Sequence, residues 1–155
     1  LYDRNSRLLI LGSFPSVKSR EMRFFYGHPQ NRFWRVIAAL TDYPVPHTIE
    51  DKKKMLHENH IALWDTIASC EIEGSSDSSI KGVVPNNLNI ILETAPIQAV
   101  YCNGSKSYEL YHKYCEKQTG MPAFKLPSTS PANAACSLDR LIKEWSVIMD
   151  RLREV

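Results

Sequence analysis

Short apolar runs alternate with helix-forming stretches along this chain, and this alternation constrains the fold more than any other feature. The apolar runs at 7–11, 61–65, 97–102 and 122–126 have the length of buried strands. Between and after them, apolar residues recur at helical spacing, which predicts helices at 31–40, 48–59, 85–94, 103–115 and 138–152. Strands that alternate with helices build a parallel sheet covered on both faces. The sequence therefore predicts an α/β fold, a three-layer α/β/α sandwich with a short, mainly parallel four-stranded central sheet.

Length and composition set the broad class. A chain of 155 residues suits one domain with a single core, so residues 1–155 are expected to form one domain. No apolar run approaches the roughly 20 residues of a membrane span, and no charged-then-apolar leader is present, so we expect a cytoplasmic monomer without membrane contact. The cysteines are far apart in the sequence and form no CxxC pair, and His57 and His60 lack the HExxH spacing. We expect reduced, partly buried thiols, no metal and no cofactor. The cysteines are Cys70, Cys102, Cys115 and Cys136.

The positive charge is concentrated near the start of the chain. Residues 1–40 hold seven Arg and Lys against two acidic residues, a balance of +5, whereas the whole chain carries only +2. A local basic patch that includes Arg20, Arg23, Arg32 and Arg35 fits transient contact with phosphates. An ordinary solvated surface explains the same charges equally well.

The loops that follow the predicted strands hold the unusual residues. Parallel sheets bind ligands at the carboxyl ends of their strands, which here lead into loops 12–30, 65–80, 103–105 and 127–136. In the first loop, the glycine of Gly12-Ser13-Phe14-Pro15-Ser16 permits a tight turn and the proline fixes the chain direction. The last loop combines two prolines with small hydroxyl residues, whose amides and hydroxyls suit phosphate contacts, although most such stretches are plain loops.

Aromatic residues and arginines are interleaved at 24–34. Rings in a loop suit stacking on bases, and Phe14, Phe25 and Tyr26 are open candidates for such a role. Phe33 and Trp34 are better explained as core residues of the helix that follows.

Taken in order, the segments resemble a known family. The Gly-Ser-Phe-Pro-Ser turn, Tyr-Gly-His-Pro-Gln-Asn-Arg-Phe-Trp, Ala-Leu-Trp-Asp, Val-Tyr-Cys-Asn-Gly and Leu-Pro-Ser-Thr-Ser-Pro-Ala-Asn occur in this sequence from residue 8 to 145. The chain resembles the uracil-DNA glycosylase superfamily, closest to its hypoxanthine (deoxyinosine) branch. The resemblance implies a base-excision repair enzyme whose partner is DNA containing a deaminated base. Such an enzyme flips that base out and hydrolyses its N-glycosidic bond, with hypoxanthine as the first candidate and xanthine as the second.

The resemblance also implies roles for particular residues. The first motif lacks the Asn or Asp that positions water in most branches, and in the hypoxanthine branch this role moves to Asn31. Ser128 replaces the histidine of the highly active uracil branch, so strong uracil cleavage is not expected. Phe14, followed by Tyr26, is expected to stack on the flipped base, whose edge meets the amides near Ser13. The remaining residues of the implied base pocket are Gly12, Pro15, His28 and Asn103, and the implied DNA-binding wedge is Ser128, Thr129, Ser130, Pro131, Ala132 and Asn133.

Several of these residues have a structural alternative. Asn31 is neutral, and its amide can orient water through its oxygen or donate to the base through its nitrogen, but it also suits a plain helix cap. Asp65 is a second catalytic candidate, acting on water or on the base edge, or a structural carboxylate. His28 can stabilise negative charge or be structural, and Asn103 can contact the base or tie loops together. At the level of function, the alternatives are a mismatch-type uracil/thymine glycosylase of the same fold and a nucleic-acid-binding module without catalysis.

Overall fold

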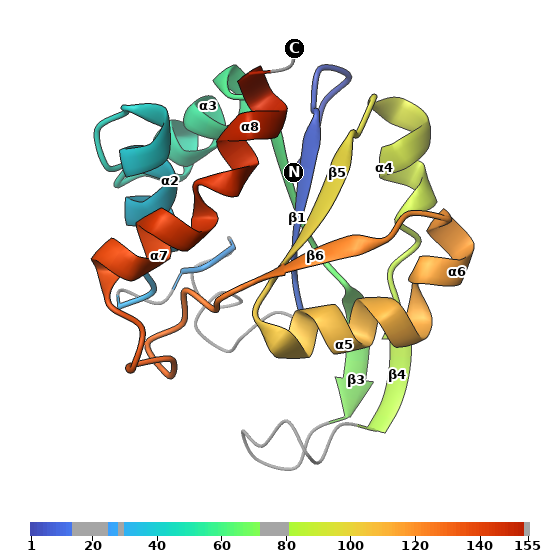
Figure 1. Ribbon diagram of the computed structural model, residues 1–155. Coiled ribbons are helices and arrows are strands. Elements are labelled where there is room, and N and C mark those ends of the chain that lie inside the picture. The colour runs from blue at the N-terminus through green and yellow to red at the C-terminus, as the bar shows by residue number, and fades with distance from the viewer. Residues whose placement is uncertain (14–24, 28–29, 72–80, 154–155) are drawn as a thin grey trace.

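The four strands that run through the middle of the molecule form a parallel sheet. The computed structural model describes residues 1–13, 25–27, 30–71 and 81–153 (Figure 1). The strands are β1 (Leu8–Gly12), β2 (Ile61–Asp65), β5 (Ala99–Asn103) and β6 (Ala123–Leu126), and their order in the sheet is β2-β1-β5-β6. All three neighbouring pairs are parallel, which confirms the predicted sheet.

Helices cover both faces of this sheet. Leu8 and Ile10 of β1 pack into a core with α2 (Phe33–Thr41), α3 (Ile49–Glu58), α7 (Leu138–Trp145) and α8 (Val147–Arg153). Leu9 and Leu11, which point to the opposite face, pack with α4 (Asn89–Thr94) and α5 (Ser105–Tyr114), and the short α6 (Glu116–Thr119) lies beside these two helices (Figure 1). Because successive strand residues alternate between faces, a run of apolar residues such as β1 supplies both cores. The three-layer sandwich predicted from the sequence is confirmed.

The aromatic core connects α2 to the C-terminal helices. Phe33 is fully buried and packs edge-on against Trp34 and Trp145, with ring centroids 4.9 and 5.9 Å apart. The predicted core role of Phe33 and Trp34 is therefore confirmed. The indole Nε1 of Trp145 donates 2.9 Å to the carbonyl of Pro127, so this core also fixes the chain just after β6.

Several elements differ from the sequence-based prediction, among them the short helix α6, which was not predicted. Part of the predicted loop 65–80 is an antiparallel hairpin, β3 (Ile67–Glu71) with β4 (Lys81–Pro85); residues 72–80 lie outside the described ranges. Helix α4 begins at Asn89 rather than residue 85, because Pro85 still belongs to β4 and the Asn86 amide bonds the carbonyl of Thr66. The predicted helix 138–152 is split at Ser146, whose Oγ donates 2.6 Å to the Lys143 carbonyl and so competes with the helical bonding pattern.

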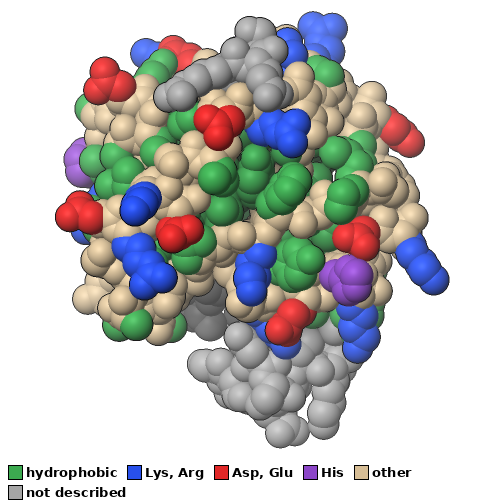
Figure 2. All heavy atoms as spheres, in the orientation of Figure 1, with side chains coloured by type: hydrophobic (Ala, Val, Ile, Leu, Met, Phe, Trp, Pro, Cys, Tyr) green, Lys and Arg blue, Asp and Glu red, His purple; other side chains and the backbone are tan. Residues whose placement is uncertain are grey.

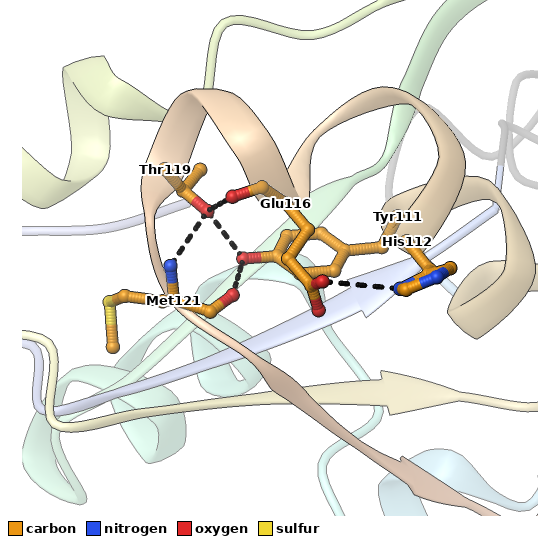
Figure 3. Close-up of polar contacts among 5 residues, drawn as sticks. All are labelled: Tyr111, His112, Glu116, Thr119 and Met121. Carbon is orange, nitrogen blue, oxygen red and sulfur yellow. Dashed lines mark hydrogen bonds and ion pairs between the residues drawn. The ribbon is translucent and has the colours of Figure 1, made fainter.

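A polar network joins α5 to the start of β6, away from the carboxyl edge of the sheet. The Tyr111 hydroxyl donates 2.6 Å to the Met121 carbonyl and lies 2.7 Å from Oγ1 of Thr119 (Figure 3). The neighbouring His112 lies 3.1 Å from a carboxylate oxygen of Glu116. The Tyr111 and Thr119 hydroxyls are both bonded within the chain, which indicates a structural role. Across the described ranges, no helix combines the length and apolar character needed to cross a membrane.

Candidate active site

The residues predicted to carry chemistry meet at the carboxyl edge of the sheet. Gly12 ends β1 beside Asp65, its register partner at the end of β2. Asn103 ends β5 opposite Leu126, which ends β6 and leads into the loop 127–136. Parallel strands present their carboxyl ends at one edge, so four strand ends that are distant in sequence are brought together here.

Asn31, Asn103 and Thr129 form one hydrogen-bonded chain at this edge. The Nδ2 of Asn103 donates 3.0 Å to Oγ1 of Thr129, and the Thr129 hydroxyl donates 2.8 Å to Oδ1 of Asn31. The Thr129 amide donates back to Oδ1 of Asn103 at 3.0 Å. Thr129 is fully buried, so its side chain faces Asn31 and not the solvent, where contact with DNA phosphates was expected.

The partners of Asn31 fix which way its amide faces. Its Oδ1 also accepts a 2.9 Å bond from the backbone amide of Phe33 at the start of α2. A backbone amide can only donate, so the atom facing it must be the oxygen. That oxygen accepts two bonds, and among the described residues the Asn31 Nδ2 donates to none. The predicted cap of α2 is thus present in a shifted form, because Arg32 is the residue at the N-cap position.

Asp65, Gly12 and Tyr26 form a second cluster on the β1–β2 side. A Cβ atom built on Gly12 would lie 2.8 Å from Oδ1 of Asp65 and 3.4 Å from the Tyr26 hydroxyl oxygen. Position 12 therefore requires glycine, because a side chain there would clash with the Asp65 carboxylate. Burial raises the pKa of the Asp65 carboxyl from 3.8 to about 6.

Tyr26 is held in an unusual conformation. Its backbone φ of +51° lies in the left-handed region, which is uncommon for an aromatic residue. Its ring packs on Phe33 with centroids 4.3 Å apart. Burial raises the pKa of its phenol, and the Asn103 side chain opposes this rise only in part. Within the described part of the chain the hydroxyl is buried and forms no hydrogen bond of acceptable geometry.

Residues that the sequence analysis did not single out form hydrogen bonds to the backbone at the carboxyl end of β1. Thr66 donates to the Gly12 carbonyl from its amide at 2.8 Å and from its hydroxyl at 2.9 Å. The Ser107 hydroxyl donates 2.8 Å to the Leu11 carbonyl. The Ile67 amide donates 2.9 Å to the carbonyl of Ser13, a predicted pocket residue. Thr66 directly follows Asp65, and its place just after the predicted strand 61–65 was the signal that the sequence offered.

The predicted wedge is a tightly bonded loop. Oγ of Ser128 accepts from the Ser130 amide, and the Asn133 side chain donates 3.0 Å to the Ser128 carbonyl. Gly104, with φ +93°, lies so close that a Cβ there would come within 3.1 Å of the Ser128 Cβ. Pro131 is half-buried and Ala132 is exposed. The loop therefore presents a small apolar surface on a rigid base.

Arg32 holds this loop from below. Its guanidinium donates to the carbonyls of Ser130 at 2.9 Å, Asn133 at 3.0 Å and Cys136. Its backbone amide donates 3.0 Å to the Thr129 carbonyl. The sequence analysis left open whether Arg32 contacts phosphates or lies on an ordinary solvated surface, and in the structure its NH1 and NH2 groups bond three carbonyls of the protein itself. Three bonds from one planar guanidinium explain why an arginine suits this position.

Other predicted residues cannot be placed. Phe14, Pro15 and His28, together with Arg20 and Arg23, lie outside the described residues. On the face seen in Figure 2, Lys and Arg are mixed with Asp and Glu and do not form a patch of one sign.

Among the described residues, no three His, Cys, Asp or Glu side chains gather as a metal site. Cys102, Cys115 and Cys136 are buried free thiols, as expected, and burial raises the pKa of Cys102 to about 12 and that of Cys115 to about 11.

Comparison with known proteins agrees with this architecture. A protein from Methanosarcina acetivorans named hypoxanthine DNA glycosylase is 35% identical over 148 residues, 94% of this chain and 92% of that protein. A protein of the same name from Methanosarcina barkeri is 35% identical over 109 residues, 69% of each chain. The solution NMR structure of a candidate uracil DNA glycosylase from M. acetivorans has a TM-score of 0.83 at 34% identity, covering 98% of this chain and 94% of that one. Residues 1–148 match the model of the uracil DNA glycosylase superfamily, and the chain belongs to this superfamily.

Proposed function

We propose that this protein is a DNA glycosylase of base-excision repair that releases a deaminated base, hypoxanthine first and xanthine second, and leaves an abasic site. The observation that carries the proposal is the Asn31 amide, whose oxygen is held by Phe33 and Thr129 while its Nδ2 has no acceptor among the described residues. Two relatives at 35% identity bear the name hypoxanthine DNA glycosylase, which supports this choice of base.

The reaction requires the base to leave the duplex. A stacked base is inaccessible to an enzyme, and extruding it costs a few kcal/mol, less for a mismatched or damaged base. The loop 128–133 is suited to fill the vacated space, because Pro131 and Ala132 present apolar atoms on a loop held by Arg32. Small apolar side chains inserted between base steps are a common means of holding DNA open.

Asn31 then acts as a hydrogen-bond donor to the departing base. Water adds its oxygen to C1′, the C1′–N9 bond breaks, and the electron pair of that bond goes to the base, which takes up a proton. Negative charge develops on the base in the oxocarbenium-like transition state, and a fixed donor that faces it lowers the barrier. A neutral amide whose oxygen is already occupied is poorly suited to be a general base. Of the two roles open to Asn31, donation through Nδ2 is therefore favoured over orientation of water.

Thr129 and Asn103 are positioning residues for this amide. If the Asn31 side chain rotated by half a turn about its last bond, its NH₂ would face the Phe33 amide and two donors would meet. The bond from Thr129 adds a second reason for the oxygen to stay where it is. Preorganised groups of this kind stabilise a transition state without reorganising during the reaction.

A panel of duplexes tests the proposal. Each carries hypoxanthine, xanthine, uracil or mismatched thymine, is cut under single-turnover conditions, and is then treated with hot alkali. We expect breakage only after alkali, and hypoxanthine release at least about tenfold faster than uracil release, equivalent to about 1.4 kcal/mol of barrier. Faster release of uracil or thymine would support the mismatch-type alternative, and binding without release of any base would support a non-catalytic module.

A further inference from the structure

Asn31 and Arg32, two successive residues, are both bonded to the loop 127–136. The Thr129 hydroxyl donates 2.8 Å to Oδ1 of Asn31, and the Arg32 backbone amide donates 3.0 Å to the Thr129 carbonyl. The Arg32 guanidinium donates to three further carbonyls of the same loop. Among the described residues, five hydrogen bonds therefore join the segment that carries the proposed catalytic amide to the loop that contains the predicted wedge.

Two successive turns of this loop direct three carbonyls at the Arg32 guanidinium. The Asn133 amide donates 3.0 Å to the Ser130 carbonyl, and the Cys136 amide donates 3.2 Å to the Asn133 carbonyl, which closes the two turns. The carbonyls of Ser130, Asn133 and Cys136 all accept from Arg32. Carbonyl oxygens that face one point repel one another unless a donor occupies that point. The planar fork of a guanidinium supplies several N–H groups at once, and the single ammonium of lysine does not reproduce it.

Thr129 directly precedes the first of these turns. Its side chain is fully buried, its carbonyl accepts from the Arg32 amide, and its own amide donates 3.0 Å to Oδ1 of Asn103. Asn103 therefore holds Thr129 from the end of β5, and Arg32 holds the residues that follow it. A hydrogen bond weakens steeply when its geometry departs from the preferred range. A displaced loop would thus weaken the bond from the Thr129 hydroxyl to Asn31.

We propose that Arg32 is a positioning residue for release of the base: its guanidinium holds the loop 127–136 so that the Thr129 hydroxyl stays on Asn31. The inference rests on the proposed function and adds to it a link between the predicted wedge and the amide that faces the base. Asn31 is then correctly oriented only while the loop is in place. Preorganisation of this kind lowers the barrier without rearrangement during the reaction.

Two other roles for Arg32 lead to different results. An arginine that serves stability alone leaves the rate of base release unchanged at temperatures where the protein is folded. An arginine that acts on DNA directly affects the rate to the same extent whether or not residue 129 carries a hydroxyl. A chain of contacts does not by itself demonstrate energetic coupling, so the coupling between Arg32 and Thr129 has to be measured.

A double-mutant cycle measures this coupling. Arg32→Lys is introduced into wild type and into Thr129→Val, and release of hypoxanthine is followed under single-turnover conditions well below the Tm of every variant. We expect Arg32→Lys to slow release by at least about tenfold when Thr129 is present. In Thr129→Val the further loss should be less than about threefold, because the bond that Arg32 maintains is already absent. Equal losses in both backgrounds, or no loss when Thr129 is present, would overturn the proposal.

Tyr111→Phe is the control for lost stability. The Tyr111 hydroxyl bonds Met121 and Thr119 away from the carboxyl edge of the sheet (Figure 3), so its removal should lower Tm and leave the rate of release unchanged. A slowing by Tyr111→Phe as large as that by Arg32→Lys would assign the effect to stability and overturn the proposal. If Arg32→Lys does not fold, Arg32→Gln, which keeps a planar donor group with fewer hydrogens, takes its place with the same expected results.

The side-chain NH₂ of Asn31 provides a readout that requires no activity. Its two resonances in nitrogen–proton correlation spectra are assigned by their loss in Asn31→Ala. We expect Arg32→Lys and Thr129→Val to move them in the same direction and Tyr111→Phe to leave them in place. Unmoved resonances in Arg32→Lys would overturn the proposal. If wild type releases no deaminated base, the proposed function fails, whereas the spectra still decide whether Arg32 positions Asn31.

Discussion

The hydroxyl of Thr129 donates a 2.8 Å hydrogen bond to Oδ1 of Asn31 across 98 positions of the sequence. The bond joins the loop after β6 to the segment that leads into α2. The Phe33 amide, Asn31 and Asn103 lie in one line of hydrogen bonds through this hydroxyl. The orientation of the proposed catalytic amide thus depends on a side chain that is itself fully buried.

Replacing Thr129 tests this dependence. Thr129→Val keeps the shape but removes the donor, and we expect single-turnover release of hypoxanthine to slow by about tenfold or more, equivalent to about 1.4 kcal/mol. Thr129→Ser restores the hydroxyl and should recover most of the rate. Binding to inosine-containing DNA, measured by fluorescence anisotropy, should change little in either variant. Equal rates for the Val and Ser variants would mean that the hydroxyl has no positioning role.

Asn31→Asp tests the chemical role of the amide. A carboxylate can accept from both Phe33 and Thr129, but it lacks the NH₂ group. If that group donates to the departing base, Asn31→Asp should slow cleavage by two or more orders of magnitude, about 2.7 kcal/mol or more, as should Asn31→Ala. A rate for Asn31→Asp near that of wild type would instead assign Asn31 to the attacking water. Loss of the bond to the Phe33 amide in Asn31→Ala should appear separately, as roughly 1 kcal/mol of stability.

The raised pKa of Asp65 predicts a pH-dependent stability. Burial raises the pKa of this carboxyl from 3.8 to about 6, so the folded protein holds the proton more tightly than the unfolded chain. The stabilisation from that proton is complete below pH 3.8 and is lost as pH rises through about 6. Asp65→Asn should therefore gain stability relative to wild type between pH 5 and pH 8, by up to about 3 kcal/mol. Urea unfolding of both proteins at pH 5 and pH 8 measures the difference between their free energies of unfolding. A smaller advantage of Asp65→Asn at pH 8 than at pH 5 would contradict the predicted direction of the pKa shift.

Comparing Arg32→Lys with Arg35→Lys tests whether the wedge loop, residues 128–133, depends on the Arg32 guanidinium. Lysine at position 32 cannot reproduce three bonds from one planar group, so Arg32→Lys should lower the free energy of unfolding by roughly 1 to 3 kcal/mol. Arg35 is exposed on α2, and Arg35→Lys should change it by less than about 0.5 kcal/mol. Denaturant unfolding of both variants provides the comparison. Similar stabilities would show that the loop does not depend on the Arg32 guanidinium.

Much of the fold was predictable because it depends on local patterns. The apolar runs located all four strands of the central sheet. The starts of α3 and α7 are set locally as well, since the side chains of Thr48 and Ser137 accept from the amides of Asp51 and Arg140. The β3–β4 hairpin was not predicted, since a Gly- and Ser-rich stretch separates its strands and reads as a loop. The break at Ser146 depends on one side-chain bond within an otherwise regular helical pattern.

The sequence predicted which residues meet at the site, but it did not predict the hydrogen bonds between them. Asn31, Asp65 and Asn103 stand next to strand or helix ends, so topology alone brings them to one edge. The direction in which Thr129 points and the commitment of Arg32 to three carbonyls depend on contacts between residues about one hundred positions apart. Sequence spacing carries no information about such contacts.

Direct identification of the released product tests the central claim. Wild type and Asn31→Ala are incubated with a duplex that contains a single deoxyinosine, and the small molecules and the DNA strand are separated by liquid chromatography and identified by mass. The proposed reaction predicts free hypoxanthine in equal amount to an intact strand carrying one abasic site, with little of either product from Asn31→Ala. Release of a nucleoside or nucleotide, a strand cut before alkali, or equal product from both proteins would contradict it.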